Sequence, residues 1–327
     1  MRIKDFEIKN LYGKYSFKSQ LDEKVNIIVG NNGTFKSTLL EIVRRIITAI
    51  NISYELPEGR TITDYEQAYI SLDNNIILHS LVSTFISSER IRKVGEMENH
   101  ALGYLEERKI YRLIDNIHAL KVYKEDKELE SFDSSQIRVD YISTFDIKDK
   151  DTNTRETLLD KQLKQLQSDY GYYLNGLQKQ FTSYLNKQGV VTKDVYNQIY
   201  TRKALFDNLV NEAFKETGKI IDNESDKLRF IIDGKTSIDA DKLSSGEKQL
   251  LIVFLTVLLE DGQEYVLMMD EPEISMHISW QYKLIDMILQ LNPNVQIILT
   301  THSPMIFSDG WGDKAIYMED ITTNTRK

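Results

Sequence analysis

The stretch VNIIVGNNGTFKSTLL, residues 25–40, constrains the fold of this chain more than any other segment. A mostly apolar run ends at Gly30, a turn rich in asparagine and glycine follows, and a helical apolar pattern starts near Leu39. Gly30, Lys36 and Ser37 match the pattern G-x-x-x-x-G-K-[ST], in which the backbone N–H groups of a glycine-rich turn hold phosphates at the start of a helix. A strand, a turn and a helix in this order indicate a phosphate-binding loop.

Phe35 stands where that pattern has its second glycine. Glycine there lets the backbone adopt a positive φ and approach the phosphates, so we expect an aromatic residue to cost about 1–3 kcal/mol of strain. A cost of that size weakens nucleotide binding by about one to two orders of magnitude without abolishing it. Because Lys36 and Ser37 are retained, we predict a genuine nucleotide site with slow or conditional turnover.

Composition excludes several kinds of chemistry. The chain has 327 residues and no cysteine, so disulfides, thiol nucleophiles and cysteine–zinc sites are ruled out. Its net charge of −9 argues against nucleic-acid binding through a broad basic field, although a local groove around Arg90, Arg92 and Lys93 stays open. The charged N-terminus and the short longest apolar run, residues 250–259, predict a soluble, cytoplasmic protein with no membrane partner.

The pattern of apolar residues changes twice along the chain, from strand-like to helical and back, which predicts three segments. We expect a β-rich lobe with the phosphate-binding loop over 1–147, a helical insert over 148–222 and a closing lobe over 223–327. A polar linker at 148–154 opens the insert, whose second helix is expected over about 195–217. One apolar stripe at intervals of three and four marks its first helix: Leu159, Leu163, Leu166, Tyr170, Tyr173, Leu177, Phe181 and Tyr184.

The closing lobe carries the remaining motifs. A hairpin turning at Asp233 and Gly234 comes first, then a buried helix over 246–260. An apolar strand, YVLMM, then leads into DEPEIS, a helix follows from about residue 278, and the strand VQIILTT precedes His302.

Three of these motifs have side chains suited to nucleotide chemistry. Asp270 and Glu271 end an apolar strand, where one carboxylate can hold Mg²⁺ through water and the next can polarise an attacking water. The segment KLSSGEKQLL opens a helix and offers an anion site, although Ser244 or Ser245 could equally be a plain helix cap. His302 could contact a γ-phosphate or could be an ordinary turn residue.

The order of the four motifs resembles that of the ABC-type ATPases, and within them the SMC/RecF-like class. Roughly 200 residues separate Lys36 from Ser244, about twice the spacing in transporter subunits, and the helical insert accounts for the excess. The segments LSSGEKQ, DEPEISMHISWQ and THSP are similar to those of small AAA/ABC ATPases from bacterial anti-phage defence operons. The resemblance implies an α/β fold: an ABC-ATPase head, a P-loop NTPase with a β-rich N-terminal lobe and an inserted helical hairpin.

The resemblance also implies roles for matching residues, with ATP and Mg²⁺ as cofactors. Lys36 would contact the β- and γ-phosphates, Glu271 would be the general base and His302 would sense the γ-phosphate. Ser37 and Asp270 would hold the metal. The residues that would wrap the phosphates are Gly30, Asn31, Asn32, Gly33, Thr34, Phe35, Lys36, Ser37 and Thr38.

A second subunit is implied by the third motif. In the resembling ATPases this motif closes over the ATP of the other copy, so we expect a homodimer or higher homo-oligomer. The residues concerned are Ser244, Ser245, Gly246 and Glu247.

Two further positions depart from the family's pattern. His277 occupies the place where many relatives have aspartate. The glutamine that usually follows the strand closing the first lobe is missing from VDYISTFDI, where Thr144 or Asp146 could substitute.

The leading functional hypothesis is an ATPase switch that controls a separate effector, a nuclease or toxin, in bacterial defence. One alternative is a nucleotide-dependent scaffold with little hydrolysis, which Phe35 and the missing glutamine favour and Glu271 opposes. Another is an SMC/RecF-like DNA-repair ATPase, against which the net acidity weighs. A transporter subunit is the least favoured, because of the insert.

Overall fold

In a computed structural model of the chain, the run before Gly30 forms a buried strand inside a five-stranded parallel sheet. The strand order is β14-β3-β13-β12-β8. The strands are β3 (Val25–Val29), β8 (Val139–Ser143), β12 (Tyr265–Asp270), β13 (Val295–Thr301) and β14 (Ala315–Tyr317). Every residue of β12 and β13 is buried, which explains why the apolar residues of these strands are not confined to every second position.

The structure describes residues 1–51, 65–84, 116–129, 137–143, 157–225 and 227–324. The chain forms two units: unit 1 is Met1–Glu23, Glu41–Ile137 and Met318–Lys327, and unit 2 is Lys24–Leu40 and Arg138–Tyr317. The basic cluster at Arg90, Arg92 and Lys93, the linker at 148–154, and both Thr144 and Asp146 lie outside the described residues.

The unit boundaries differ from the segments drawn on the sequence. Lys24–Leu40, expected in the first lobe, groups with Arg138–Tyr317 because β3 pairs in parallel with β13 and β14. The division of the chain into three segments, 1–147, 148–222 and 223–327, remains a prediction.

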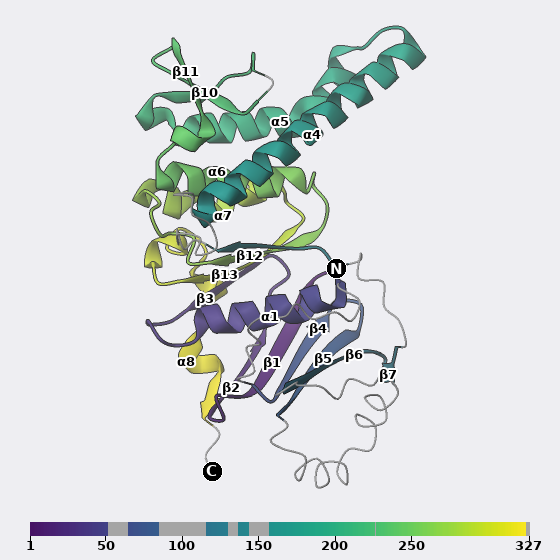
Figure 1. Cartoon of the computed structure of the whole chain (residues 1–327), viewed down its shortest axis with the longest axis vertical. Helices are drawn as coiled ribbons and strands as arrows, with labels where there is room; N and C mark the ends of the chain where they lie inside the picture. Colours follow the sequence, from purple (N-terminus) through teal and green to yellow (C-terminus); the bar gives the residue numbers. More distant parts are fainter. Residues whose placement is uncertain (52–64, 85–115, 130–136, 144–156, 226, 325–327) are drawn as a thin grey trace. The chain divides into compact units, whose positions relative to one another are not determined.

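Unit 1 is built on an antiparallel sheet with the order β15-β2-β1-β4-β5-β6-β7 (Figure 1). Its strands are β1 (Ile3–Leu11), β2 (Tyr15–Gln20), β4 (Gln67–Leu72), β5 (Ile76–Thr84), β6 (Asn116–Lys124), β7 (Lys127–Glu128) and β15 (Thr322–Asn324). In β1, Phe6 and Ile8 are buried, whereas Glu7 and Lys9, which alternate with them, are not. This alternation is expected for a sheet with one covered face. The β-rich character predicted for the N-terminal region is confirmed.

Among the described residues, two helices complete this part of the chain. Helix α1 (Lys36–Asn51) belongs to unit 2 up to Leu40 and to unit 1 from Glu41, and α8 (Met318–Ile321) precedes β15. In the unit 1 part of α1, the buried side chains recur with helical spacing at Ile42, Val43, Ile46 and Ile47.

The predicted helical insert is a hairpin of two helices, α4 (Leu158–Gln188) and α5 (Lys193–Ala213), which reaches beyond the other helices of unit 2 (Figure 1). Thr157 and Asp160 form a capping box at the start of α4, and Gly189 ends it with a φ of 72°. The predicted apolar stripe is buried at Leu159, Leu163, Tyr170 and Leu177. Rings from the two helices contact each other, for example Tyr170 and Phe206 at a centroid distance of 5.8 Å.

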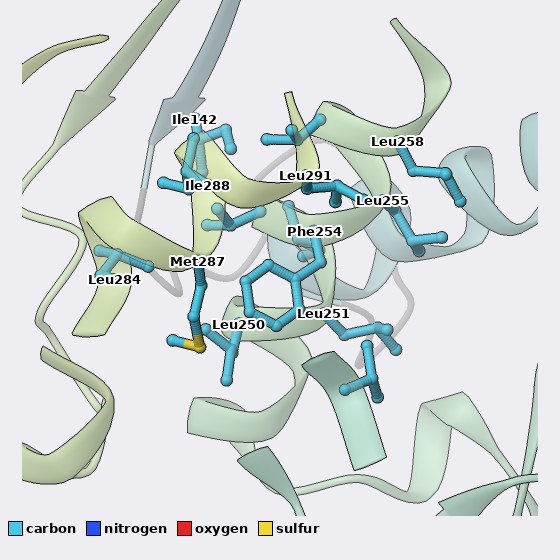
Figure 2. Close-up of a cluster of buried hydrophobic side chains, with 14 of the residues drawn as sticks. Ile142, Leu250, Leu251, Phe254, Leu255, Leu258, Leu284, Met287, Ile288 and Leu291 are labelled. Atoms are coloured by element: carbon cyan, nitrogen blue, oxygen red, sulfur yellow. The ribbon is translucent and has the colours of Figure 1, made fainter. Parts of the chain in front are cut away.

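The core of unit 2 lies between this hairpin and the parallel sheet. Helix α6 (Ser245–Leu259) packs against α4, α5 and α7 (Ile278–Leu291), and its residues from Gln249 to Leu258 are all buried. Phe254 of α6 and Ile288 of α7 are completely enclosed, and Figure 2 shows them within one apolar cluster that also includes Ile142 of β8. The buried helix predicted over 246–260 is therefore confirmed.

A small sheet and, in the described part of the chain, four short 3₁₀ helices connect these elements. Strands β9 (Lys219–Ile221), β10 (Arg229–Ile232) and β11 (Thr236–Asp239) pair antiparallel, and the predicted turn at Asp233 and Gly234 has positive φ at both residues. The 3₁₀ helices are η2 (Lys215–Thr217), η3 (Ala240–Lys242), η4 (Pro304–Ile306) and η5 (Gly312–Lys314). Over the described residues, no helix has the length and apolar character needed to cross a membrane.

Asp140 is an acid of β8 that lies opposite Leu267 in the apolar part of β12. Burial, reinforced by the nearby charge of Glu260, raises the pKa of Asp140 from 3.8 to about 7, while Arg138 opposes the shift. The folded protein therefore binds a proton that the unfolded chain has released, and this acid costs stability increasingly as the pH rises from about 4 to about 7.

We expect Asp140→Asn, which has no charge to bury, to raise the melting temperature at pH 8 and to have a smaller effect at pH 5. Thermal unfolding across that range measures the difference, with Asp239→Asn, an exposed acid paired to Arg229, as the control. A gain in stability that is the same at both pH values would contradict the account.

Candidate functional site

The carboxyl ends of three strands of the parallel sheet meet at one edge. β13 lies between β3 and β12, with Thr301 opposite Val29 and Thr300 opposite Asp270. Because all three strands run in the same direction, the loops that follow them leave the sheet side by side, where open α/β sheets bind ligands.

The turn between β3 and α1 uses the left-handed backbone conformation at two residues. φ is 79° at Gly33 and 68° at Phe35. Phe35 thus adopts the conformation for which glycine is favoured, so the strained backbone predicted there is confirmed. The Thr34 hydroxyl donates to the Asn31 carbonyl at 2.8 Å, and the Leu39 N–H donates to the Phe35 carbonyl at 2.8 Å, which starts the hydrogen bonding of α1.

The side chains of this turn differ in how accessible they are. Lys36 is buried, with 4% of its surface exposed. Asn31, Asn32 and Gly33 are exposed, while the other members of the predicted set are half-buried: Gly30, Thr34, Phe35, Ser37 and Thr38.

Lys36 points back over its own turn. Its Nζ donates to the carbonyls of Gly30 at 3.0 Å and Asn31 at 3.3 Å, lies 2.8 Å from Nε2 of His302 and is 3.7 Å from Oε1 of Glu271. Burial lowers the pKa of Lys36, and the opposing charges of Glu271 and then Asp270 limit that shift.

Ser37 and Asp270 are in direct contact. The Ser37 hydroxyl donates to Oδ1 of Asp270 at 2.9 Å, and the Thr300 hydroxyl donates to the same oxygen. Among the described residues no group of three or more His, Asp or Glu side chains could hold a metal by itself. One hydroxyl and one carboxylate suit Mg²⁺, which retains waters and takes its remaining ligands from substrate phosphates, so these residues fit the predicted metal site.

Glu271 and His302 form the other half of the site. Oε1 of Glu271 is 2.6 Å from Nε2 of His302, and Glu271 has a φ of 49°. The Glu271 N–H donates to the Thr300 carbonyl at 3.0 Å, which fixes this residue to the neighbouring strand. A glutamate in the left-handed region costs strain, a feature that concentrates at functional sites.

The third motif begins α6 and bonds mainly with its own chain. Ser244 caps the helix, because its hydroxyl oxygen accepts from the Glu247 N–H at 3.4 Å, and the same hydroxyl donates to Oε2 of Glu247 at 2.9 Å. Glu247 is 1% exposed and accepts from Lys219 at 2.7 Å and from Thr217 at 2.8 Å. The helix-cap interpretation is confirmed, with Ser244 as the N-cap. Ser244 and Ser245 are both exposed, and the anion site stays a prediction.

Gly246 is required by a close approach of backbone. A Cβ atom added at this position would lie 2.2 Å from the carbonyl oxygen of Ser275, in the loop between β12 and α7. Gln249 of α6 contacts the same loop, donating to the Pro272 carbonyl at 2.7 Å. The start of α6 is thus packed directly on the loop that follows Glu271.

A hollow of about 390 Å³ opens beside the start of α6. His277 lies at its edge, caps α7 by accepting from the Ser279 N–H at 3.4 Å, and is exposed. The hollow is lined by Glu216, Thr217, Ser244, Gly246, Glu247, Ser275, Met276, His277 and Trp280.

Glu273 is a residue of this site that the sequence reasoning missed. Its Oε1 accepts from the Thr301 hydroxyl at 2.7 Å, from the His302 N–H at 2.8 Å and from the Ser303 N–H at 3.2 Å. The only signal in the sequence was a third acid close to Asp270 and Glu271, in DEPE.

Comparison with known proteins gives one family and several relatives. A family described as "AAA domain, putative AbiEii toxin, Type IV TA system" matches residues 25–308. The chain is 21% identical to the Retron Vc95 probable ATPase of Vibrio cholerae serotype O1 biovar El Tor, covering 91% of this chain and 69% of that protein. It is 24% identical to the Septu protein PtuA of Bacillus thuringiensis, covering 92% of this chain and 72% of that protein.

Among solved structures, this chain is similar to the Smc head bound to the C-winged helix domain of ScpA. The sequence identity is 13%, the TM-score is 0.49, and the match covers 94% of this chain and 92% of that one.

The predicted fold is confirmed by the parallel sheet, in which a turn joins β3 to α1, together with the family match over most of the chain. The resemblance to defence-associated ATPases is confirmed by the retron and Septu relatives. This chain belongs to the AAA family of AbiEii-like ATPase domains.

Proposed function

We propose that the chain binds ATP with Mg²⁺ and hydrolyses it slowly, as a switch that joins two copies around two nucleotides and controls a partner effector. One observation carries this proposal: Lys36, Ser37, Asp270, Glu271 and His302 converge at the edge where β3, β13 and β12 end.

In the proposed reaction, Lys36 and the N–H groups of the turn bind the β- and γ-phosphates. Ser37 and Asp270 would hold Mg²⁺, which would offset the charge of the phosphate oxygens. Glu271 accepts a proton from a water whose oxygen bonds to the γ-phosphorus. The bond from that phosphorus to the bridging oxygen breaks, its electron pair stays on ADP, and inorganic phosphate is the second product.

His302 contributes through its protonation. Nε2 lies within hydrogen-bonding distance of both Lys36 and Glu271, yet it can only accept from the ammonium when it carries no proton and only donate to the carboxylate when it carries one. A phosphate oxygen that takes up the Lys36 ammonium removes this competition. In the proposal, His302 then donates to the γ-phosphate or to Glu271.

The surface at the start of α6 supports the two-copy arrangement. Ser244 and Ser245 are exposed at a helix N-terminus, which favours negative charge, and Ser244 lines the hollow together with His277. We propose that this surface meets the γ-phosphate bound to the other copy.

The relatives support a role in bacterial defence. Their names identify a retron ATPase and a Septu protein. In the resemblance drawn from the sequence, toxicity belongs to a separate nuclease or toxin, and we propose such a protein as the partner. The net charge of −9 weighs against direct DNA binding as the main activity.

A second candidate is a scaffold that binds ATP and scarcely hydrolyses it. The positive φ of Phe35 favours it, because the strained turn weakens the hold on phosphate. Glu271, placed 2.6 Å from His302 and beside Lys36, favours hydrolysis instead.

Replacing the proposed general base tests the chemistry. We expect Glu271→Gln to bind ATP normally and to lose about 10² to 10⁴ in turnover, because glutamine cannot take the proton of water. Asp286→Asn, an acid of α7 that contacts Trp311, is the control for carboxylate loss elsewhere in unit 2. Phosphate release and nucleotide titration measure both quantities, and unchanged turnover would remove Glu271 from this role.

A bulky charge at the start of α6 tests the assembly. Ser244→Arg should prevent ATP-driven dimer formation, since the guanidinium fills the proposed contact surface. Ser244→Ala loses the same helix cap, worth about 1 kcal/mol, without adding bulk, so it should still dimerise. Gel filtration with a non-hydrolysable ATP analogue separates these outcomes, and a dimer that survives Ser244→Arg contradicts the shared site.

Relieving the strained turn tests the effect of Phe35. Because φ is 68° at this residue, Phe35→Gly should tighten ATP binding or raise basal turnover about tenfold, the equivalent of about 1.4 kcal/mol. Asp233→Gly relieves a φ of 53° in the β10–β11 turn and should change neither. If Phe35 instead packs against a partner, the glycine variant keeps its parental ATPase and loses that partner in a pull-down.

A further inference from the structure

The carboxylate of Glu273 joins two loops of the site. It follows β12, two residues after Glu271, and its Oε1 accepts three hydrogen bonds from the residues that follow β13. Two of the three donors are backbone N–H groups, those of His302 and Ser303. Bonds from backbone N–H groups to a carboxylate are charge-assisted, so this contact holds the loop more firmly than a neutral acceptor would.

The contact between Glu273 and the loop after β13 is close to the reacting groups, because it involves the main chain of His302. The main chain of His302 is held by Glu273, while its imidazole lies 2.6 Å from Glu271 and 2.8 Å from Lys36. Glu273 is also near enough to Lys36 for its charge to favour the protonated ammonium, although Glu271 and Asp270 contribute more. One acid thus fixes the backbone from which His302 reaches its two partners.

The second carboxylate oxygen of Glu273 takes no part in this contact. Oε2 of Glu273 is buried and makes no hydrogen bond among the described residues, which costs free energy that an apolar side chain would not. The three hydrogen bonds to Oε1 must offset that cost.

A second link holds the neighbouring residue but not His302. The Ser303 hydroxyl donates to Oε1 of Gln281 at 2.7 Å, and Nε2 of Gln281 donates to the Met276 carbonyl at 3.1 Å. Ser303 is also bonded locally, since its N–H donates to the Thr301 hydroxyl at 2.9 Å as well as to Glu273. The side chain that bonds the main-chain N–H of His302 is Glu273.

We propose that Glu273 is a positioning residue for ATP hydrolysis, which sets the orientation of His302 toward Glu271 and the γ-phosphate. This inference rests on the proposed function. It requires that Glu273 act through His302, so that its removal affects turnover more than ATP binding.

A double-mutant cycle with His302 tests the proposal. We expect Glu273→Ala to lower kcat about tenfold with less than a threefold change in ATP affinity. In a His302→Ala background the same substitution should have no further effect on kcat, because the group that it positions is gone. Glu273→Gln should restore part of kcat, since its amide oxygen can still accept from the His302 N–H.

Asp160→Ala is the matched structural control. Asp160 also accepts several hydrogen bonds, from Thr157 and from Lys248 at 2.7 Å, but it caps α4 and does not contact His302. Its loss should lower the melting temperature without lowering kcat. If Glu273→Ala does not fold, the cycle is run with Glu273→Gln.

The outcomes separate the two hypotheses. Wild-type turnover no greater than that of Lys36→Ala would defeat the proposed function and this inference with it. Normal wild-type turnover with a Glu273→Ala effect that is additive to His302→Ala, or that is absent, would overturn the role of Glu273 alone.

Discussion

The parallel pairing of β13 with β3 on one side and β12 on the other is the constraint on which the rest of unit 2 depends. It places the end of β3, from the first tenth of the chain, beside two strands from its last fifth. A shift of one residue in either register would displace a loop along the strands by about 3.3 Å, more than the tolerance of a hydrogen bond between Lys36 and His302. The continuous burial of β12 and β13 and the packing of α6 and α7 over them hold that register in place.

Much of this could be predicted from the sequence because the signals are local. The apolar runs, the Asp233–Gly234 turn and the spacing of the α4 stripe each follow from neighbouring residues alone. The role of Glu273 could not be predicted, because it depends on how far β12 and β13 extend before their loops begin. The need for glycine at position 246 was equally hidden, since the obstacle is the Ser275 carbonyl, on a loop that follows a different element.

Backbone strain sits on both sides of the proposed phosphate position. Phe35 and Glu271 each have a positive φ, at a cost of the order of 1–3 kcal/mol apiece. Contacts with the rest of the fold must therefore hold both residues in this conformation. At Glu271, two hydrogen bonds hold the backbone. The Glu271 N–H donates to the Thr300 carbonyl of β13, and the Pro272 carbonyl accepts from Nε2 of Gln249 in α6. Glycine would relieve the cost at Phe35 but, at position 271, would also remove the carboxylate. Strain at Glu271 is therefore inseparable from its chemistry, whereas strain at Phe35 is not.

The base of the helical insert is tied to both helices that begin at the proposed contact surface. The carbonyl of Ala213, the last residue of α5, accepts from Nε1 of Trp280 in α7 at 3.0 Å. Lys219, a few residues on, pairs with Glu247 of α6 at 2.7 Å, a bond with one fully buried partner and hence costly to break. The end of α5 is therefore bonded to α7, and the strand β9 that follows it is bonded to α6, so the hairpin is joined to both helices at its base.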